Sequence, residues 1–302
     1  MAGSHHGIGA VYIALSAISL VFNGLAIYIL TRTRFLRRAC SWYILSMAVS
    51  DFLMRLVVDT VGAYANFSDQ TLGQIPCQLY GFASTVLGLV SISHLAATSL
   101  DIWRSVVLQR RASRKQTVYI IAVLWGTAFA WGILPLVGWS SYALQPGFSY
   151  CALKWYSRSL NDLSFTLTIL ILFFFFPILI CGFCYSRVFC VVRVTLRDAR
   201  RRWGQESFTA RRTLRCEHKV AKIYLAMTLA FLVAWSPYAI TSLYISWTGI
   251  QTIPDIARIL PPMFAKAYSC YNPVIYYGMS RKFRRGVRRT LGRRDMTFST
   301  IT

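Results

Sequence analysis

The sequence predicts an all-α membrane protein, a seven-transmembrane helix bundle that ends in a short amphipathic cytosolic helix. Composition, apolar runs and charge distribution each indicate this fold. The 302 residues are 56% hydrophobic and 14% charged, and seven apolar runs can each cross a hydrocarbon core of about 30 Å. A single domain is expected over 1–302, with spans near 8–30, 42–65, 77–100, 118–138, 161–192, 220–247 and 256–278 and the amphipathic helix at 280–291.

Each span has its own support in the chain. The first lacks a preceding basic residue and is followed by "TRTRFLRR", which predicts a retained helix rather than a cleaved signal. The second contains "AVSD", the third begins at Cys77, and the fourth ends in "PLVGWSSY". The fifth contains "ILILFFFFPILI", a run that would be hard to keep soluble, and the sixth contains "AWSPY". The seventh includes "PPMFAKAYSCYNPVIYYG" and is followed by the basic, amphipathic "SRKFRRGVRR".

The basic residues behind the net charge of +23 are concentrated in alternate connections between the spans. Basic residues number four in 31–39, five in 104–115, nine in 193–219 and eight in 281–294, whereas the opposite connections hold only Lys154, Arg158 and Arg258. This asymmetry predicts a multi-pass protein of the cell membrane with an extracellular N-terminus and a cytosolic C-terminus. The basic loops are expected to contact anionic lipid headgroups, and nucleic acid is not expected as a partner.

Two of the eight cysteines are expected to form a disulfide. Cys77 starts the third span and Cys151 lies in the second outer loop, so both face an oxidising compartment. No metal site is expected. The single N-glycosylation sequon begins at Asn66, close to a helix end.

Lys266 lies in the middle of the seventh span, about 15 Å from either end of that helix. Snorkelling carries an ammonium only part of that distance, so the lysine needs another explanation. A desolvated lysine has an amine that can condense with an aldehyde to form a Schiff base. A neutral buried lysine and a structural ion pair are the alternatives, and helical periodicity does not choose among them.

Several motifs resemble those of the rhodopsin-like G-protein-coupled receptors, over about residues 10–290. They are "FNG" with Asn23, "AVSD" with Asp51, Trp125, "AWSPY" with Trp235 and Tyr238, and "NPVIY" with Asn272, Pro273 and Tyr276. Lys266, seven residues before Pro273, matches the retinal-attachment position of the opsins, and "GWSSY" resembles the start of an opsin's second outer loop. Among opsins, "LVAWSPY", "FAK" and "YNP" resemble the peropsin, neuropsin and retinal-photoisomerase group most.

The resemblance implies that retinal binds covalently to Lys266. It also implies a pocket around the polyene, in which Trp235 and Tyr238 share one helical face. The remaining pocket residues that the resemblance implies are Tyr80, Ser84, Thr85, Gly88 and Phe174. Ordinary helix packing is the alternative explanation for these aromatic residues.

Both usual counterions to a protonated Schiff base are missing. Tyr80 stands three residues after Cys77 and Gln145 stands six residues before Cys151, where opsins of different groups carry a glutamate. Among the ten acidic residues, Asp59 is the candidate counterion because it lies in the second span, two turns outward from Asp51. Arg55 lies between these aspartates, so an internal ion-pair ladder is one alternative, and an unprotonated Schiff base that absorbs in the ultraviolet is another.

The cytosolic end of the third span departs from the receptor pattern, because Asp101-Ile102-Trp103 stands where the family has Asp/Glu-Arg-Tyr. Ile102 lacks the cation that would pair with Glu217 and engage a heterotrimeric G protein, although the coupling residues Tyr185 and Tyr276 remain. The leading hypothesis is a light-sensing receptor. A retinal photoisomerase with little or no G-protein signalling is the alternative, and a receptor for a diffusible ligand is the third.

Overall fold

The computed structural model describes residues 2–32, 39–68, 71–146, 149–202, 207–248 and 254–290. Almost all of these residues are helical. The elements are α1 (Ala2–Arg32), α2 (Ala39–Leu53), the π-helix η2 (Met54–Asp59), α3 (Thr60–Phe67), α4 (Gln74–Val106), α5 (Arg114–Ile133), the 3-10 turn η3 (Leu134–Leu136), β1 (Tyr142–Leu144), β2 (Cys151–Leu153), α6 (Leu160–Leu170), the π-helix η4 (Ile171–Phe175), α7 (Phe176–Arg202), α8 (Ser207–Thr248), α9 (Asp255–Met279) and α10 (Arg281–Thr290).

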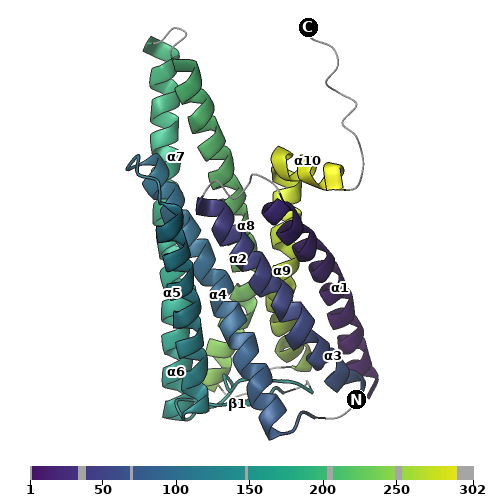
Figure 1. The fold of residues 1–302 in the computed structure, drawn as a ribbon. Helices are drawn as coiled ribbons and strands as arrows, with labels where there is room; N and C mark the ends of the chain where they lie inside the picture. Colours follow the sequence, from purple (N-terminus) through teal and green to yellow (C-terminus); the bar gives the residue numbers. More distant parts are fainter. Residues whose placement is uncertain are drawn as a thin grey trace.

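The predicted bundle of seven membrane-spanning helices is confirmed, with α10 as the short helix that follows it (Figure 1). The second span is made of α2, η2 and α3 in succession, and the fifth of α6, η4 and α7. Within the described ranges, five helices are long and apolar enough by themselves to cross a membrane: Gly9–Arg32, Gln74–Val106, Arg114–Leu136, Leu160–Thr195 and His218–Thr248. Large apolar side chains such as Val21, Leu179 and Val233 face outward, as expected for surfaces that contact lipid.

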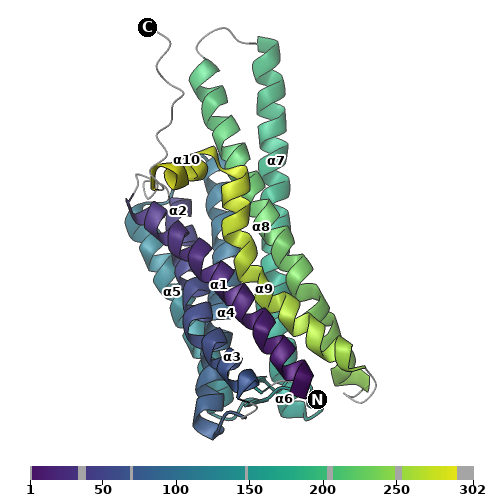
Figure 2. The same cartoon turned by 90° about the vertical axis from the view of Figure 1, so that its right-hand side faces the viewer.

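The two ends of the bundle differ. At one end α10 lies across the helix ends, and α7 and α8 project beyond the other helices (Figures 1 and 2). At the opposite end lie the start of α1 and the small β-hairpin (Figure 1). The basic residues of α10 therefore gather at the end toward which α7 and α8 extend.

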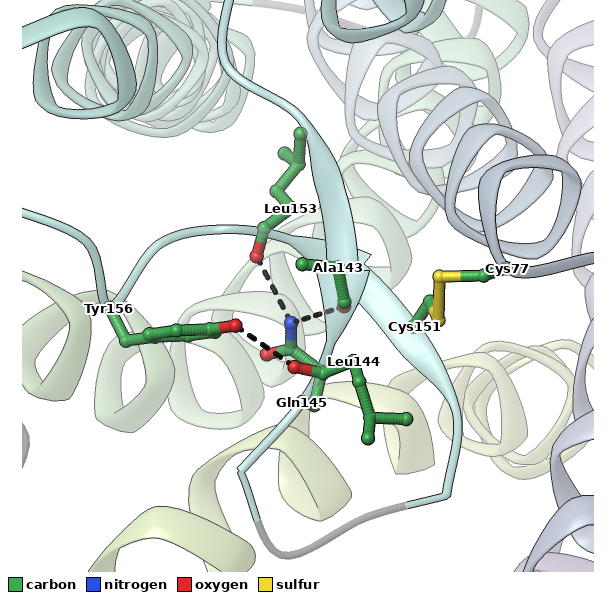
Figure 3. The surroundings of a disulfide bond; sticks show 7 residues. All are labelled: Cys77, Ala143, Leu144, Gln145, Cys151, Leu153 and Tyr156. Atoms are coloured by element: carbon green, nitrogen blue, oxygen red, sulfur yellow. Dashed lines mark hydrogen bonds between the residues drawn. A yellow bond between two sulfur atoms is a disulfide. The ribbon is translucent and has the colours of Figure 1, made fainter. Parts of the chain in front are cut away.

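A two-stranded hairpin closes the end of the bundle next to the start of α4. Strands β1 and β2 pair antiparallel, with Tyr142 opposite Leu153 and Leu144 opposite Cys151. The predicted disulfide between Cys77 and Cys151 is present and ties the hairpin to the first turn of α4 (Figure 3). Gly81 permits a close approach here, because a Cβ atom at this position would lie 2.4 Å from the Tyr142 ring.

The π-helix η2 changes the direction in which the outer half of the second span points its side chains. A π turn contains more residues than an α turn, so residues beyond it are rotated relative to a continuous α-helix. Arg55 and Asp59 both lie within η2, and both are completely buried. The i, i+4, i+8 ladder from Asp51 through Arg55 to Asp59, one of the alternatives that the sequence left open, is therefore interrupted.

Candidate functional site

Lys266 lies near the middle of α9, and its side chain points into the bundle. The Nζ atom donates hydrogen bonds to Asp59 Oδ1 at 3.1 Å and to the Tyr80 hydroxyl at 2.8 Å. It also lies 4.5 Å from the centre of the Tyr150 ring, within the range of a cation–π contact. Three segments that are distant in sequence, η2, α4 and the loop before β2, therefore converge on this amine.

Asp59 is shared between two basic side chains. Its Oδ1 atom accepts from Lys266, and its Oδ2 atom forms an ion pair with Arg55 Nη1. The Asp59 side chain has no exposed surface, whereas that of Lys266 is 15% exposed. An unpaired carboxylate would be costly at such a position, so the two basic partners explain how the acid can be buried.

Arg55 also reaches the backbone of the helix that carries the lysine. Its Nε atom donates to Ser269 Oγ at 2.8 Å, and its Nη2 atom donates to the main-chain carbonyl of Lys266. Ser269 is three residues after Lys266, so both acceptors lie on one face of α9. The guanidinium therefore joins the second span to α9 through side-chain and backbone contacts.

Asp51 is held separately from this cluster. Ser91 Oγ donates to Asp51 Oδ1 at 2.7 Å, and Asn272 Nδ2 donates to Asp51 Oδ2 at 2.9 Å. The ladder is thus present only between Arg55 and Asp59. Sequence spacing missed this division, because a π turn leaves no clear signature in hydrophobic periodicity.

A cavity of roughly 210 Å³ extends from Lys266 into the bundle. Its lining is mostly apolar and comes from the second span, α4, the hairpin, η4, α8 and α9. Six residues expected at the pocket line it: Ser84, Thr85, Gly88, Phe174, Trp235 and Tyr238. Tyr80, the seventh, contacts the Lys266 amine directly.

Aromatic rings form much of the wall that α8 contributes. Phe231 stacks on Trp235 with ring centroids 5.7 Å apart, and Trp235 meets Tyr238 edge-on at 6.0 Å. Tyr238 in turn packs against Trp155 of the outer loop at 5.5 Å. This row of rings adds an apolar surface to a cavity whose lining also includes the charged side chains of Lys266 and Asp51.

Gln145 stabilises the hairpin and is not free to serve another partner. Its Nε2 atom donates to the carbonyls of Ala143 and Leu153, both at 3.2 Å, and its Oε1 atom accepts from Trp155 Nε1 (Figure 3 shows the two carbonyl contacts). The residue is buried and its side chain lines the cavity. Both the nitrogen and the oxygen of this amide therefore have hydrogen-bond partners within the loop that carries the hairpin.

Two residues of this cluster were not found from the sequence: Tyr150, which contacts the Lys266 amine, and Ser269, which accepts from Arg55. Tyr150 precedes the disulfide cysteine Cys151, but its position over the Lys266 amine depends on the fold of the loop. Ser269 could have been predicted, because a residue three positions after Lys266 lies on the same face of a helix.

The last turns of α4 bury apolar side chains next to Asp101. Ile102 is 2% exposed and belongs to the same buried cluster as Tyr185 and Tyr276. The Trp103 ring packs against Phe183 with centroids 6.0 Å apart. Asp101 is partly buried, and Glu217 lies within α8 but its side chain is outside the described part of the structure.

The proline of the "NPVIY" motif, Pro273, lies inside α9. A proline has no N–H, so the carbonyl of Ser269 loses its usual partner within the helix. Asn23 Nδ2 of α1 donates to that carbonyl at 3.1 Å. The motif residues near Asp51 thus connect α1, α2, α4 and α9 by hydrogen bonds.

Comparison with known proteins identifies relatives along nearly the whole chain. Residues 22–276 match the family described as "7 transmembrane receptor (rhodopsin family)". The chain is 29% identical to Melanopsin-B of Xenopus laevis over 294 residues, which are 94% of this chain and 54% of that protein. It is 31% identical to the rhodopsin of Todarodes pacificus over 280 residues, 89% of this chain and 62% of that protein.

A solved structure of squid rhodopsin has the same fold, with a TM-score of 0.90 and 29% identity over 97% of this chain and 86% of that one. The chain spans about half to two thirds of the length of these curated relatives. The relatives include melanopsins and cephalopod rhodopsins, so the expected affinity with the peropsin, neuropsin and photoisomerase group is corrected. Short motifs such as "FAK" had suggested that group, and they weigh less than identity over the full bundle.

Proposed function

Because this chain belongs to the rhodopsin family of seven-transmembrane receptors, we propose that it is a light-sensing receptor that binds retinal as a Schiff base at Lys266. The observation that carries the proposal is the position of Lys266 Nζ at the edge of an aromatic cavity inside the bundle. An amine there can form a C=N bond to an aldehyde with loss of one water. When bound, retinal would supply light absorption and photoisomerisation.

The residues present fit an elongated, apolar aldehyde. The cavity gives a mainly apolar lining with rings from α8, and Lys266 supplies a nucleophile at one side of it. Trp235 Nε1 is buried without a hydrogen-bond partner among the described residues, so this wall offers the ligand an aromatic face and few competing polar contacts. Ser84 and Thr85 of α4 add hydroxyl groups to the lining.

Asp59 is proposed as the counterion. It is an acid in direct contact with the Lys266 amine, and complete burial strengthens its electrostatic effect. Tyr80 accepts a hydrogen bond from the same nitrogen and occupies a position where other opsins have a glutamate. The two residues together would stabilise a positive charge at Nζ and fix the orientation of the Lys266 side chain.

Signalling is proposed to pass to a heterotrimeric G protein at the end of the bundle where α10 lies. Ligand isomerisation would favour one of two helix arrangements, and the basic cytosolic surface would contact the partner and anionic lipid. An extracellular N-terminus and a cytosolic α10 follow the positive-inside rule. Ile102 removes one cation from the coupling surface, so we expect this output to be weak.

The buried Ile102 supports a second candidate function, retinal photoisomerisation with little signalling. In that case the useful product would be the isomerised retinal itself. Chromatography of retinal isomers before and after illumination, with nucleotide exchange measured on the same sample, separates the two functions.

Retinal attachment is tested by incubating the protein with retinal and denaturing it in acid, which traps a protonated imine with visible absorbance. The parent should give this absorbance and Lys266→Ala should not. Lys222→Ala, a substitution elsewhere in the helical bundle, serves as the matched control. Equal trapping by the Lys266→Ala variant would disprove the assignment.

A further inference from the structure

The ion pair between Arg55 and Asp59 adds a second cation to the surroundings of Lys266. Arg55 is completely buried, and Asp59 carries one ionised carboxylate that contacts both basic residues. The guanidinium remains charged at any working pH. The lysine nitrogen therefore competes with a permanent cation for the same carboxylate.

We propose that Arg55 sets how tightly a proton is held at Lys266 Nζ, by adding a fixed positive charge to the buried group that Asp59 and Nζ form. With Arg55 charged, the group of Arg55 and Asp59 is already neutral, and a proton at Nζ gives it a net positive charge. Without the charge of Arg55, the site is neutral only when it holds one proton, shared between Asp59 and Nζ. Buried sites favour neutrality, so Arg55 lowers the affinity of Nζ for the proton.

Beyond Asp59, two aromatic side chains contact the Lys266 amine. Tyr80 and Tyr150 meet the amine as a neutral hydroxyl and a neutral ring. The carboxylate of Asp51 is engaged by Ser91 and Asn272. The titratable and charged groups that contact Nζ, line the same cavity or lie on α9 nearby are Asp51, Arg55, Asp59, Tyr80, Tyr150, Tyr238, Tyr268, Cys270 and Tyr271.

The proposal deepens the proposed function but can be tested without retinal. In the first measurement, the protein without retinal is treated with formaldehyde and a reducing agent across a range of pH, and methylation of Lys266 is quantified by mass spectrometry of its peptide. Only the unprotonated amine reacts. Arg55→Gln should move the midpoint of the methylation profile upward by at least about one pH unit. Arg55→Lys keeps the charge and should leave the midpoint close to that of the parent.

In the second measurement, the retinal-loaded protein is titrated by absorbance, and the same variants should shift the visible-to-ultraviolet midpoint in the same direction. Failure to bind retinal would refute the proposed function and leave the first measurement valid. An unchanged or lowered midpoint in Arg55→Gln would overturn the proposed role of Arg55. It would mean that Arg55 affects the proton at Nζ mainly by holding the Asp59 carboxylate in position and not by its positive charge.

Loss of Arg55 alone removes one of the two ion-pair partners of the buried Asp59 and can impair folding. The double variant Arg55→Gln, Asp59→Asn removes both charges and avoids that problem. Its midpoint should lie above that of Asp59→Asn alone, because the repulsion between Arg55 and the protonated nitrogen is gone. Equal midpoints for the double and single variants would show that Arg55 acts only through Asp59, which contradicts a direct charge effect.

Discussion

Replacement of Asp59 by asparagine tests the counterion directly. The substitution removes one negative charge and leaves Arg55 in place, so the site changes from neutral to positively charged before any proton binds to Lys266. An anion beside a protonated imine stabilises the charged form, and its loss makes the proton easier to remove. The midpoint of the visible-to-ultraviolet titration should therefore move to lower pH.

The size of the shift follows from the contact distance. Lys266 Nζ and Asp59 Oδ1 are 3.1 Å apart. Two unit charges at that distance interact by about 5 kcal/mol at an effective dielectric constant of about 20. That energy corresponds to an upper limit of about 4 pH units. Arg55 shares the carboxylate and Tyr80 continues to accept from Nζ, so we expect a fall of at least about 2 units.

The assay is an absorbance titration of the purified, retinal-loaded protein in the dark. Asp51→Asn is the matched control, since Asp51 lies on the same span but its carboxylate is bound by Ser91 and Asn272. This control should shift the midpoint far less than Asp59→Asn. A visible pigment whose spectrum and titration survive Asp59→Asn would refute the counterion, and an acid of the outer loops would have to be sought.

Three further results are expected. Replacement of Cys77 or Cys151 by serine should destabilise the fold by about 2–4 kcal/mol, and mass spectrometry of unreduced peptides should recover the linked pair; a free thiol at either position contradicts it. Asn66 should carry no glycan, because its side chain is buried and hydrogen-bonded to two backbone groups. A mass decrease after enzymatic deglycosylation would contradict this prediction. Ile102→Arg should raise light-dependent nucleotide exchange, and an unchanged rate with a robust parent would show that another residue has taken that role.

Much of the fold was predictable because membrane insertion imposes long apolar segments and a charge bias between loops. The seven spans and the helix after them follow from those two constraints alone. The π-helix at Met54–Asp59 was not predictable in the same way. A one-residue shift in backbone hydrogen bonding barely alters composition, and tertiary packing decides whether it is stable.

The candidate site was predictable to a similar extent. Lys266 and its aromatic neighbours on α8 lie on regular helices, where spacing translates directly into direction. Asp59 was identified as a candidate because few acidic residues lie in the membrane-spanning segments, and its carboxylate contacts the Lys266 amine. Its simultaneous pairing with Arg55 and the position of Tyr150 depend on a π turn and on a loop, and neither geometry is encoded in spacing.

The contact between Arg55 and the main-chain carbonyl of Lys266 would make the colour of the proposed pigment depend on the position of a helix, and the reverse. The same guanidinium binds Asp59, so a displacement of α9 against the second span would stretch a bond to the proposed counterion. A change of the chromophore charge, in turn, would alter how strongly the two helices are held together. The absorption spectrum of the proposed pigment would therefore report how closely α9 and the second span are held together.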